Sequence, residues 1–157
     1  MKFTLLVVGR TVDKHFTALI SEYTGRVSHY VPFDMEVIPE LKNTKSLSVQ
    51  QQKDKEGELL LKSLQPTDMV VLLDEHGQEF RSVDFARWIE RKMQTQQKRL
   101  VFVVGGPYGF SDAVYSRANE KISLSKMTYS HQMVRLVFAE QLYRAMTIIK
   151  GEPYHHE

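Results

Sequence analysis

Apolar and polar residues alternate along the chain in blocks that predict short strands separated by helices. Apolar runs bounded by glycine, proline or charged residues predict five strands, at residues 3–8, 33–38, 68–73, 100–104 and 122–124. Apolar residues at helical spacing predict four longer helices, at about residues 12–27, 48–65, 82–97 and 130–150. A brief helix is expected to start at Ser111, and residues 74–77 are expected to form a turn.

The five strands are expected to form one mostly parallel sheet with helices on both faces. Runs such as MVVLL and LVFVV are apolar on both sides, as strands buried between helices are. Because no repeat or linker interrupts the pattern, residues 1–157 are interpreted as a single α/β domain. Ligands bind such sheets beyond the carboxyl ends of the strands. The ends that we identify are Gly9, Leu73 to Asp74, Gly105 to Gly106, and Leu124 to Ser125. Three of these four follow residue 70, which favours a site in the C-terminal half.

A glycine-rich turn, GGPYG at residues 105–109, follows the fourth predicted strand. It lacks the lysine and hydroxyl of GxxxxGK[ST] and the spacing of GxGxxG, the two common phosphate-binding motifs. One interpretation is that the glycines serve only a tight turn between strand and helix. The other interpretation is that the glycines let a ligand approach the backbone closely. The loop SLSKMTYS would face the same ligand if the fourth and fifth strands are neighbours. Such a site suits a flat heterocycle such as adenine, in a cofactor held without phosphate clamps.

The closing helix carries more apolar residues than one buried stripe requires. They are Leu136, Val137, Phe138, Ala139, Leu142, Tyr143, Ala145, Met146, Ile148 and Ile149. Either the helix is central within one chain, or one face covers the sheet while another meets a second copy in a homodimer, which we favour. Glu140 and Arg144 are polar exceptions four residues apart. Arg144 therefore forms an ordinary surface pair with Glu140, or it holds an RNA phosphate or an anionic base.

The chain ends in PYHHE, a compact set of polar groups with one aromatic residue. Terminal residues are most often solvated, and that interpretation applies here too. If the tail folds over a site, Tyr154 is able to stack on a base. His155 and His156 would then hydrogen-bond the substrate or move a proton.

Composition narrows the chemistry further. With 42% hydrophobic and 25% charged residues, the 157-residue chain has the composition of an ordinary globular domain. It has no cysteine and no histidine spacing typical of zinc sites, so we expect neither a thiol nucleophile nor a metal. No apolar stretch reaches the ~18 residues that cross a membrane, which indicates a soluble cytoplasmic protein. The net charge of +2 is weakly basic and the basic residues are spread out, so RNA binding and solvated helix faces both stay open.

Three segments of the sequence closely resemble one known family. They are VVLLDEHGQEFRSVDFA, VFVVGGPYGFS and ISLSKMTYSHQMVRLVFAEQLYRAMTIIKGEPYHHE. Over essentially the whole chain, the sequence resembles the ribosomal large-subunit RNA methyltransferase H family of the SPOUT superfamily. The resemblance implies an α/β fold with a deep C-terminal trefoil knot, a homodimer, and S-adenosylmethionine bound in the knot. It also implies methylation of N3 of a pseudouridine in helix 69 of 23S ribosomal RNA, in assembled ribosomes.

The resemblance further implies roles for individual residues. The cofactor site is expected to comprise Leu73, Gly105, Leu124, Ser125, Lys126, Met127, Thr128 and Tyr129. Substrate contacts are expected from Arg144, Tyr154, His155 and His156. Some family members carry a permanent cation where this chain has His156, a residue that is mostly neutral at pH 7.

The implied reaction agrees with the residues that the chain has and lacks. A methyl group on a sulfonium is already activated, so its transfer requires neither metal nor cysteine, and the protein has mainly to position two reactants. The imide N3 must lose its proton as the methyl group moves. We expect His155 to accept this proton and Arg144 to stabilise the anion, with direct loss to solvent at the ribosome as the alternative.

Two other functions are compatible with the same pattern. One is a noncatalytic dimeric RNA-binding or ribosome-associated module, in which the glycine turn is structural. The other is a flavodoxin-like binder of a phosphate-bearing cofactor. Binding of S-adenosylmethionine distinguishes the methyltransferase from both.

Overall fold

The computed structural model describes residues 1–157, and its five strands form one sheet in which all neighbouring strands are parallel. The strands lie in the order β2-β1-β4-β3-β5. Their bounds are β1 Lys2–Val8, β2 Phe33–Ile38, β3 Met69–Glu79, β4 Arg99–Val104 and β5 Glu120–Ser123. The predicted α/β fold with a parallel sheet is confirmed. The trefoil knot stays a prediction, because strand order describes neighbours in the sheet and not the threading of the chain.

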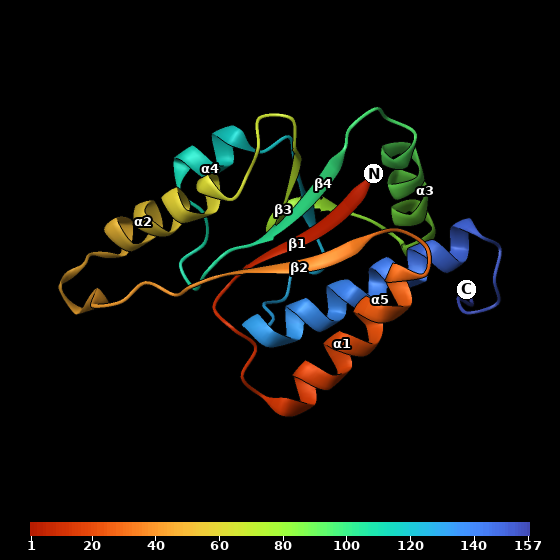
Figure 1. Ribbon diagram of the computed structural model, residues 1–157, viewed down its shortest axis with the longest axis horizontal. Helices are drawn as coiled ribbons and strands as arrows, with labels where there is room; N and C mark the ends of the chain where they lie inside the picture. Colours follow the sequence, from red (N-terminus) through yellow and green to blue (C-terminus); the bar gives the residue numbers. More distant parts are fainter.

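Helices cover both faces of this sheet (Figure 1). On one face lie α1, α3 and α5, and on the other lie α2 and α4. Their bounds are α1 Lys14–Ser28, α2 Val49–Lys62, α3 Ser82–Met93, α4 Asp112–Arg117 and α5 His131–Ile149, with a 3-10 helix at Thr44–Ser46. None of them combines the length and the apolar character needed to cross a membrane.

Strand β4 shows why the central strands are apolar throughout. Leu100, Phe102 and Val104 belong to the core beneath α1, α3 and α5, where the rings of Phe102 and Phe138 lie 4.6 Å apart between centroids. Val101 and Val103 belong to the second core, beneath α2 and α4. Successive side chains of a strand point to opposite faces. From Leu100 to Val104 the strand is buried on both faces and is therefore apolar throughout, as its sequence indicated.

Side-chain caps set where several helices begin. Asp13 accepts hydrogen bonds from the backbone N–H groups of His15 and Phe16, at 2.8 and 3.2 Å, so α1 starts at Lys14. Val12, predicted as the first apolar position of this helix, lies outside it and is 74% exposed. Ser48 forms a capping box with Gln51, which starts α2 one residue later. Two helices end earlier in the chain than predicted: α2 ends at Lys62 and α3 at Met93, instead of near residues 65 and 97.

One expectation about the sheet was wrong, and one condition set by the sequence analysis is not met. The predicted turn at residues 74–77 lies within β3, which pairs with β5 on either side of it: Leu73 and Gln78 are both in register with Ile122. The segment bulges at this point, and glycine is required at position 77 because an added Cβ would lie 2.6 Å from the Ile122 backbone. The fourth and fifth strands are also not neighbours, since β3 lies between them.

A candidate ligand cavity at the carboxyl ends of three strands

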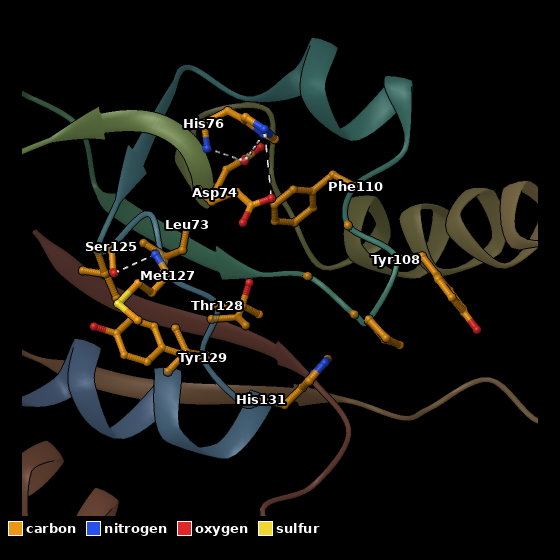
Figure 2. Close-up of a pocket in the computed structure, with 18 of the residues that line it drawn as sticks. Leu73, Asp74, His76, Tyr108, Phe110, Ser125, Met127, Thr128, Tyr129 and His131 are labelled. Atoms are coloured by element: carbon orange, nitrogen blue, oxygen red, sulfur yellow. Dashed lines mark hydrogen bonds and ion pairs between the residues drawn. The ribbon is translucent and has the colours of Figure 1, made fainter.

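A cavity of about 530 Å³ opens at the bulge of β3 and beyond the carboxyl ends of β4 and β5 (Figure 2). Its volume is within the range of small-molecule sites, and its position is the usual one for a parallel sheet. The lining comprises residues 73–76, 104–110, 124–125 and 127–129, with Lys53, Tyr115, His131 and Val134 contributed by helices. Apart from Lys53, every lining residue follows residue 70, so the cavity lies where the sequence predicts a site.

The glycine turn forms one wall of this cavity, and its glycines are required for packing as well. A Cβ at Gly105 would lie 3.0 Å from the ring of Phe110. At Gly106 it would lie 2.3 Å from the carboxylate of Glu56, which accepts a hydrogen bond of 2.8 Å from the Gly106 backbone N–H. Burial raises the pKa of Glu56 against the opposing effect of that hydrogen bond. The structural and the ligand-facing interpretations of GGPYG therefore both apply.

The loop after β5 forms a second wall, and its shape is set by its own serines. The backbone N–H of Met127 donates to Ser125 Oγ at 2.9 Å, and Ser123 Oγ donates to the Ser125 carbonyl at 2.9 Å. Figure 2 shows Ser125, Met127, Thr128 and Tyr129 together at one side of the cavity. Their backbone and the glycine turn approach the same space although β4 and β5 are not adjacent.

Most of the residues expected to bind the cofactor line this cavity. Those that do are Leu73, Gly105, Leu124, Ser125, Met127, Thr128 and Tyr129. Lys126 does not belong to the lining, because its side chain is 82% exposed and lies 3.6 Å from the carboxylate of Glu79. Its amino group therefore points to solvent, and any contact from residue 126 would have to come from its backbone.

Asp74 is a charged residue of the cavity wall to which the sequence analysis gave no role. Its side chain is only 7% exposed, and it accepts hydrogen bonds from the backbone N–H and Nδ1 of His76, at 2.9 and 3.2 Å, and from the Tyr115 hydroxyl. Burial acts to raise the pKa of Asp74, but the hydrogen bonds from Tyr115 and His76 outweigh it and lower the pKa. Burial and the same carboxylate raise the pKa of Tyr115 to about 12. The sequence signal was the position of Asp74 at a strand end.

The residues expected to contact the substrate form a separate cluster at the far end of α5. Arg144 Nη2 lies 2.6 Å from Glu140 Oε1, and Arg144 Nη1 lies 3.0 Å from His155 Nδ1. The Tyr154 hydroxyl donates to Glu140 at 3.0 Å, and its ring lies 4.8 Å from the guanidinium of Arg144. Tyr154 and His155 are thus folded onto α5 rather than solvated, whereas Pro153, His156 and Glu157 are exposed. Glu140 and Arg144 form the ion pair that was one of the two interpretations of Arg144.

None of these tail residues lines the cavity. His131 lines it at the start of α5, and Arg144 follows thirteen residues later. At 1.5 Å per residue, this separation is about 20 Å along the helix axis. Within one chain, the expected cofactor residues and the expected substrate residues are therefore apart.

The hydrogen bond from Arg144 determines which ring nitrogen of His155 carries the proton. A guanidinium only donates, so Nδ1 of His155 must accept, and a neutral imidazole then carries its proton on Nε2. Nε2 is buried without a hydrogen-bond partner. No group of three or more histidine, aspartate or glutamate side chains is arranged to hold a metal ion.

Comparison with known proteins agrees with the geometry. Residues 1–155 match the family model described as "Predicted SPOUT methyltransferase". A protein of Phocaeicola vulgatus named "Ribosomal RNA large subunit methyltransferase H" is 71% identical over the full length of both chains. Proteins of the same name from Bacteroides thetaiotaomicron and Flavobacterium johnsoniae are 68% and 54% identical, again over the full length of both.

Proposed function

Since the chain belongs to the SPOUT methyltransferase family, we propose that it transfers the methyl group of S-adenosylmethionine to ribosomal RNA of the large subunit. The proposed acceptor is N3 of a pseudouridine in helix 69 of 23S ribosomal RNA, within the assembled ribosome. Action on ribosomes places the protein in the cytoplasm. The observation that carries the proposal is the cavity between the glycine turn and the loop after β5, where seven of the eight expected cofactor residues meet.

The residues of the cavity fit S-adenosylmethionine. The glycine turn and residues 124–129 offer backbone amides and carbonyls to a purine, while Leu73 and Leu124 offer apolar surface. Gly105 lines the cavity without a side chain of its own, so a flat group is able to approach the backbone there. When bound, the cofactor supplies a methyl group activated by its sulfonium.

We propose that two copies of the chain combine to form each active site. The cluster of Arg144, Tyr154 and His155 is about 20 Å from the cavity of its own chain, so it must be supplied by the partner of a homodimer. Within one chain α5 packs between α1 and α3, which uses part of its apolar surface. Leu19 of α1 and Met133 of α5 stay 42% and 38% exposed, which leaves apolar surface for a second copy.

Arg144 and His155 have linked roles in the proposed mechanism. In the isolated chain, Arg144 occupies Nδ1 of His155, the nitrogen that would have to accept the N3 proton. We propose that Arg144 turns towards the developing imide anion and so frees Nδ1. His155 then takes the proton from N3, while N3 gains the methyl group and the electrons of the broken bond stay with sulfur. Tyr154 provides a ring for stacking on a neighbouring base.

The first experiment is calorimetric titration of the purified protein with S-adenosylhomocysteine, compared with the variant Gly105→Trp. We expect binding by the wild type and none by the variant, because the indole would fill the cavity beside Phe110. Far-ultraviolet circular dichroism and thermal unfolding establish that the variant is folded. Absence of binding by the folded wild type would favour a noncatalytic module over a methyltransferase.

The second experiment tests the acceptor. Methyl transfer to whole ribosomes is compared with transfer to free 23S ribosomal RNA, followed by mapping of the methylated nucleotide. The net charge of +2 permits few phosphate contacts, so recognition is expected to depend on the shape of the assembled ribosome. Comparable rates on the two substrates would contradict dependence on the ribosome.

A further inference from the structure

The carboxylate of Asp74 is a fixed negative charge in the wall of the cavity. Three donors orient it, and they come from the bulge of β3 and from α4: the backbone and ring of His76, and the hydroxyl of Tyr115. Figure 2 shows Asp74 and His76 above the space enclosed by Leu73, Thr128 and Phe110. A carboxylate has about four acceptor positions, so three donors from the chain leave it able to accept from a ligand.

The other acidic and basic side chains that line the cavity are Glu75 and His76, which are exposed, and Lys53 and His131, which are half-buried. Glu75 also lines the cavity, but its side chain is 52% exposed, and that of His76 is 77% exposed. Water screens such groups, whereas a charge that is 93% buried acts through a lower effective dielectric. The tyrosine and histidine donors lower the pKa of Asp74, so it is ionised at neutral pH.

An ionised carboxylate whose side chain is 7% exposed, and which pairs in the chain only with the imidazole of His76, favours a cationic ligand. The donors to Asp74 are a hydroxyl, a backbone N–H and an exposed imidazole, and no lysine or arginine pairs with it. S-adenosylmethionine carries two positive groups, the sulfonium and the α-ammonium. We propose that Asp74 is a cofactor-binding residue that recognises the positive charge of the bound cofactor, an inference that rests on the proposed function.

The test is calorimetric titration of wild type, Asp74→Asn and Glu75→Gln with three ligands. S-adenosylmethionine carries both positive groups, S-adenosylhomocysteine keeps only the ammonium, and 5′-methylthioadenosine keeps the adenosine with neither. Glu75→Gln is the matched control, because it removes the same charge from the neighbouring, exposed position. Thermal unfolding of each variant verifies its fold.

We expect Asp74→Asn to weaken binding of S-adenosylmethionine by about 10- to 100-fold, as loss of a charged hydrogen-bond partner does. Binding of 5′-methylthioadenosine should be unchanged, and Glu75→Gln should weaken S-adenosylmethionine by much less than Asp74→Asn does, because water screens the charge of Glu75. If S-adenosylhomocysteine is weakened as well, Asp74 binds the ammonium. If it is not, Asp74 binds the sulfonium and helps the enzyme to distinguish substrate from product.

Equal weakening of all three ligands would overturn the inference, because it would assign Asp74 to the ribose or the adenine. No weakening would overturn it too. Should Asp74→Asn fail to fold, Tyr115→Phe provides the second reading: it keeps the charge but removes one orienting donor. We expect it to weaken the charged ligands selectively, and unchanged selectivity would count against the role of Asp74. Failure of the wild type to bind S-adenosylmethionine would instead refute the proposed function itself.

Discussion

Gly106 has a packing role that its place in the sequence did not reveal. Its backbone N–H donates to Glu56, a residue of α2 that lies fifty positions earlier in the chain. The same carboxylate occupies the space that a Cβ at position 106 would need. The glycine turn thus connects α2 to the cavity wall, while Gly105 beside it faces the ligand space. The sequence showed the glycines but could not show which neighbour each of them accommodates.

Replacing Gly106 is expected to have the opposite effect to replacing Gly25. Gly106→Ala should displace the Glu56 carboxylate and lower the free energy of unfolding by about 1 kcal/mol, the usual value of one hydrogen bond. Gly25 lies within α1, and no atom lies within 4 Å of a Cβ added at this position. Gly25→Ala should therefore raise the free energy of unfolding by about 1 kcal/mol. Urea unfolding of the wild type and both variants measures these changes in the free energy of unfolding. Changes of the same sign in the two variants would contradict the packing role of Gly106.

His155→Ala is expected to affect turnover and not cofactor binding. The imidazole lies far from the cavity of its own chain, and its proposed task is to accept the N3 proton. Turnover should fall by about 100-fold or more, as it does when a general base is removed. Affinity for S-adenosylhomocysteine, measured by calorimetry, should stay within error of the wild type. Equal losses in both quantities, or none in either, would remove His155 from this role.

Strand β3 is the element that the sequence pattern described least well. Its buried half, Met69 to Leu73, follows the predicted apolar run. Beyond that point, pairing with β5 resumes after a bulge, although residues 74–77 have the composition of a turn. That bulge places Asp74 and His76 at the cavity. Before the strand, Asp68 forms a buried pair with Arg99 of β4, with Nη2 to Oδ2 at 2.7 Å.

The pair between Asp68 and Arg99 is expected to stabilise the sheet in a pH-dependent way. Asp68→Asn should lower the free energy of unfolding by about 2 kcal/mol at pH 7, because the half-buried Arg99 loses its hydrogen bonds to the buried carboxylate and keeps only Glu36 as a charged partner. Burial acts to raise the pKa of Asp68, but the hydrogen bonds from Arg99 and Gln65 outweigh it and hold the pKa below its usual value of 3.8.

A lowered pKa in the folded state fixes the sign of this dependence. The stabilisation is complete above the pKa of the unfolded chain, near 3.8, and is lost as the pH falls through the lower folded value. Denaturant unfolding from pH 7 to pH 2 should therefore show a constant gap between wild type and variant down to about pH 4. The gap should then narrow as the pH falls further, and an undiminished gap at pH 2 would contradict the assignment.

The arrangement of the whole chain separates the two sets of functional residues. Helix α5 starts at the cavity with His131 and ends beside the folded tail. Tyr30 of the segment after α1 donates to Glu152 at 2.7 Å, and Arg81 pairs with Glu157 at 3.0 Å. These contacts hold the tail near the end of α5, about 20 Å from the cavity. A site that needs both sets requires two chains.

Complementation between two inactive variants tests this arrangement. Gly105→Trp removes the cavity and Arg144→Ala removes the substrate cluster, so each homodimer should be inactive. Co-expression should give mixed dimers in which one site receives an intact cavity and an intact partner tail. Half of the dimers would be mixed, each with one of two sites, so activity should recover to about a quarter of the wild type. No recovery in dimers shown to be mixed would mean that each chain uses its own tail.

The spacing of apolar residues determined the five strands, the helices between them and the parallel sheet, because these depend on local periodicity and on burial of both strand faces. The resemblance of the closing segments indicated the cofactor residues. Tertiary packing decided the rest: β3 lies between β4 and β5, the bulge carries Asp74 to the cavity, and the tail folds onto α5. These features arise from contacts between residues distant in the chain, and such contacts leave no periodic signal in the sequence.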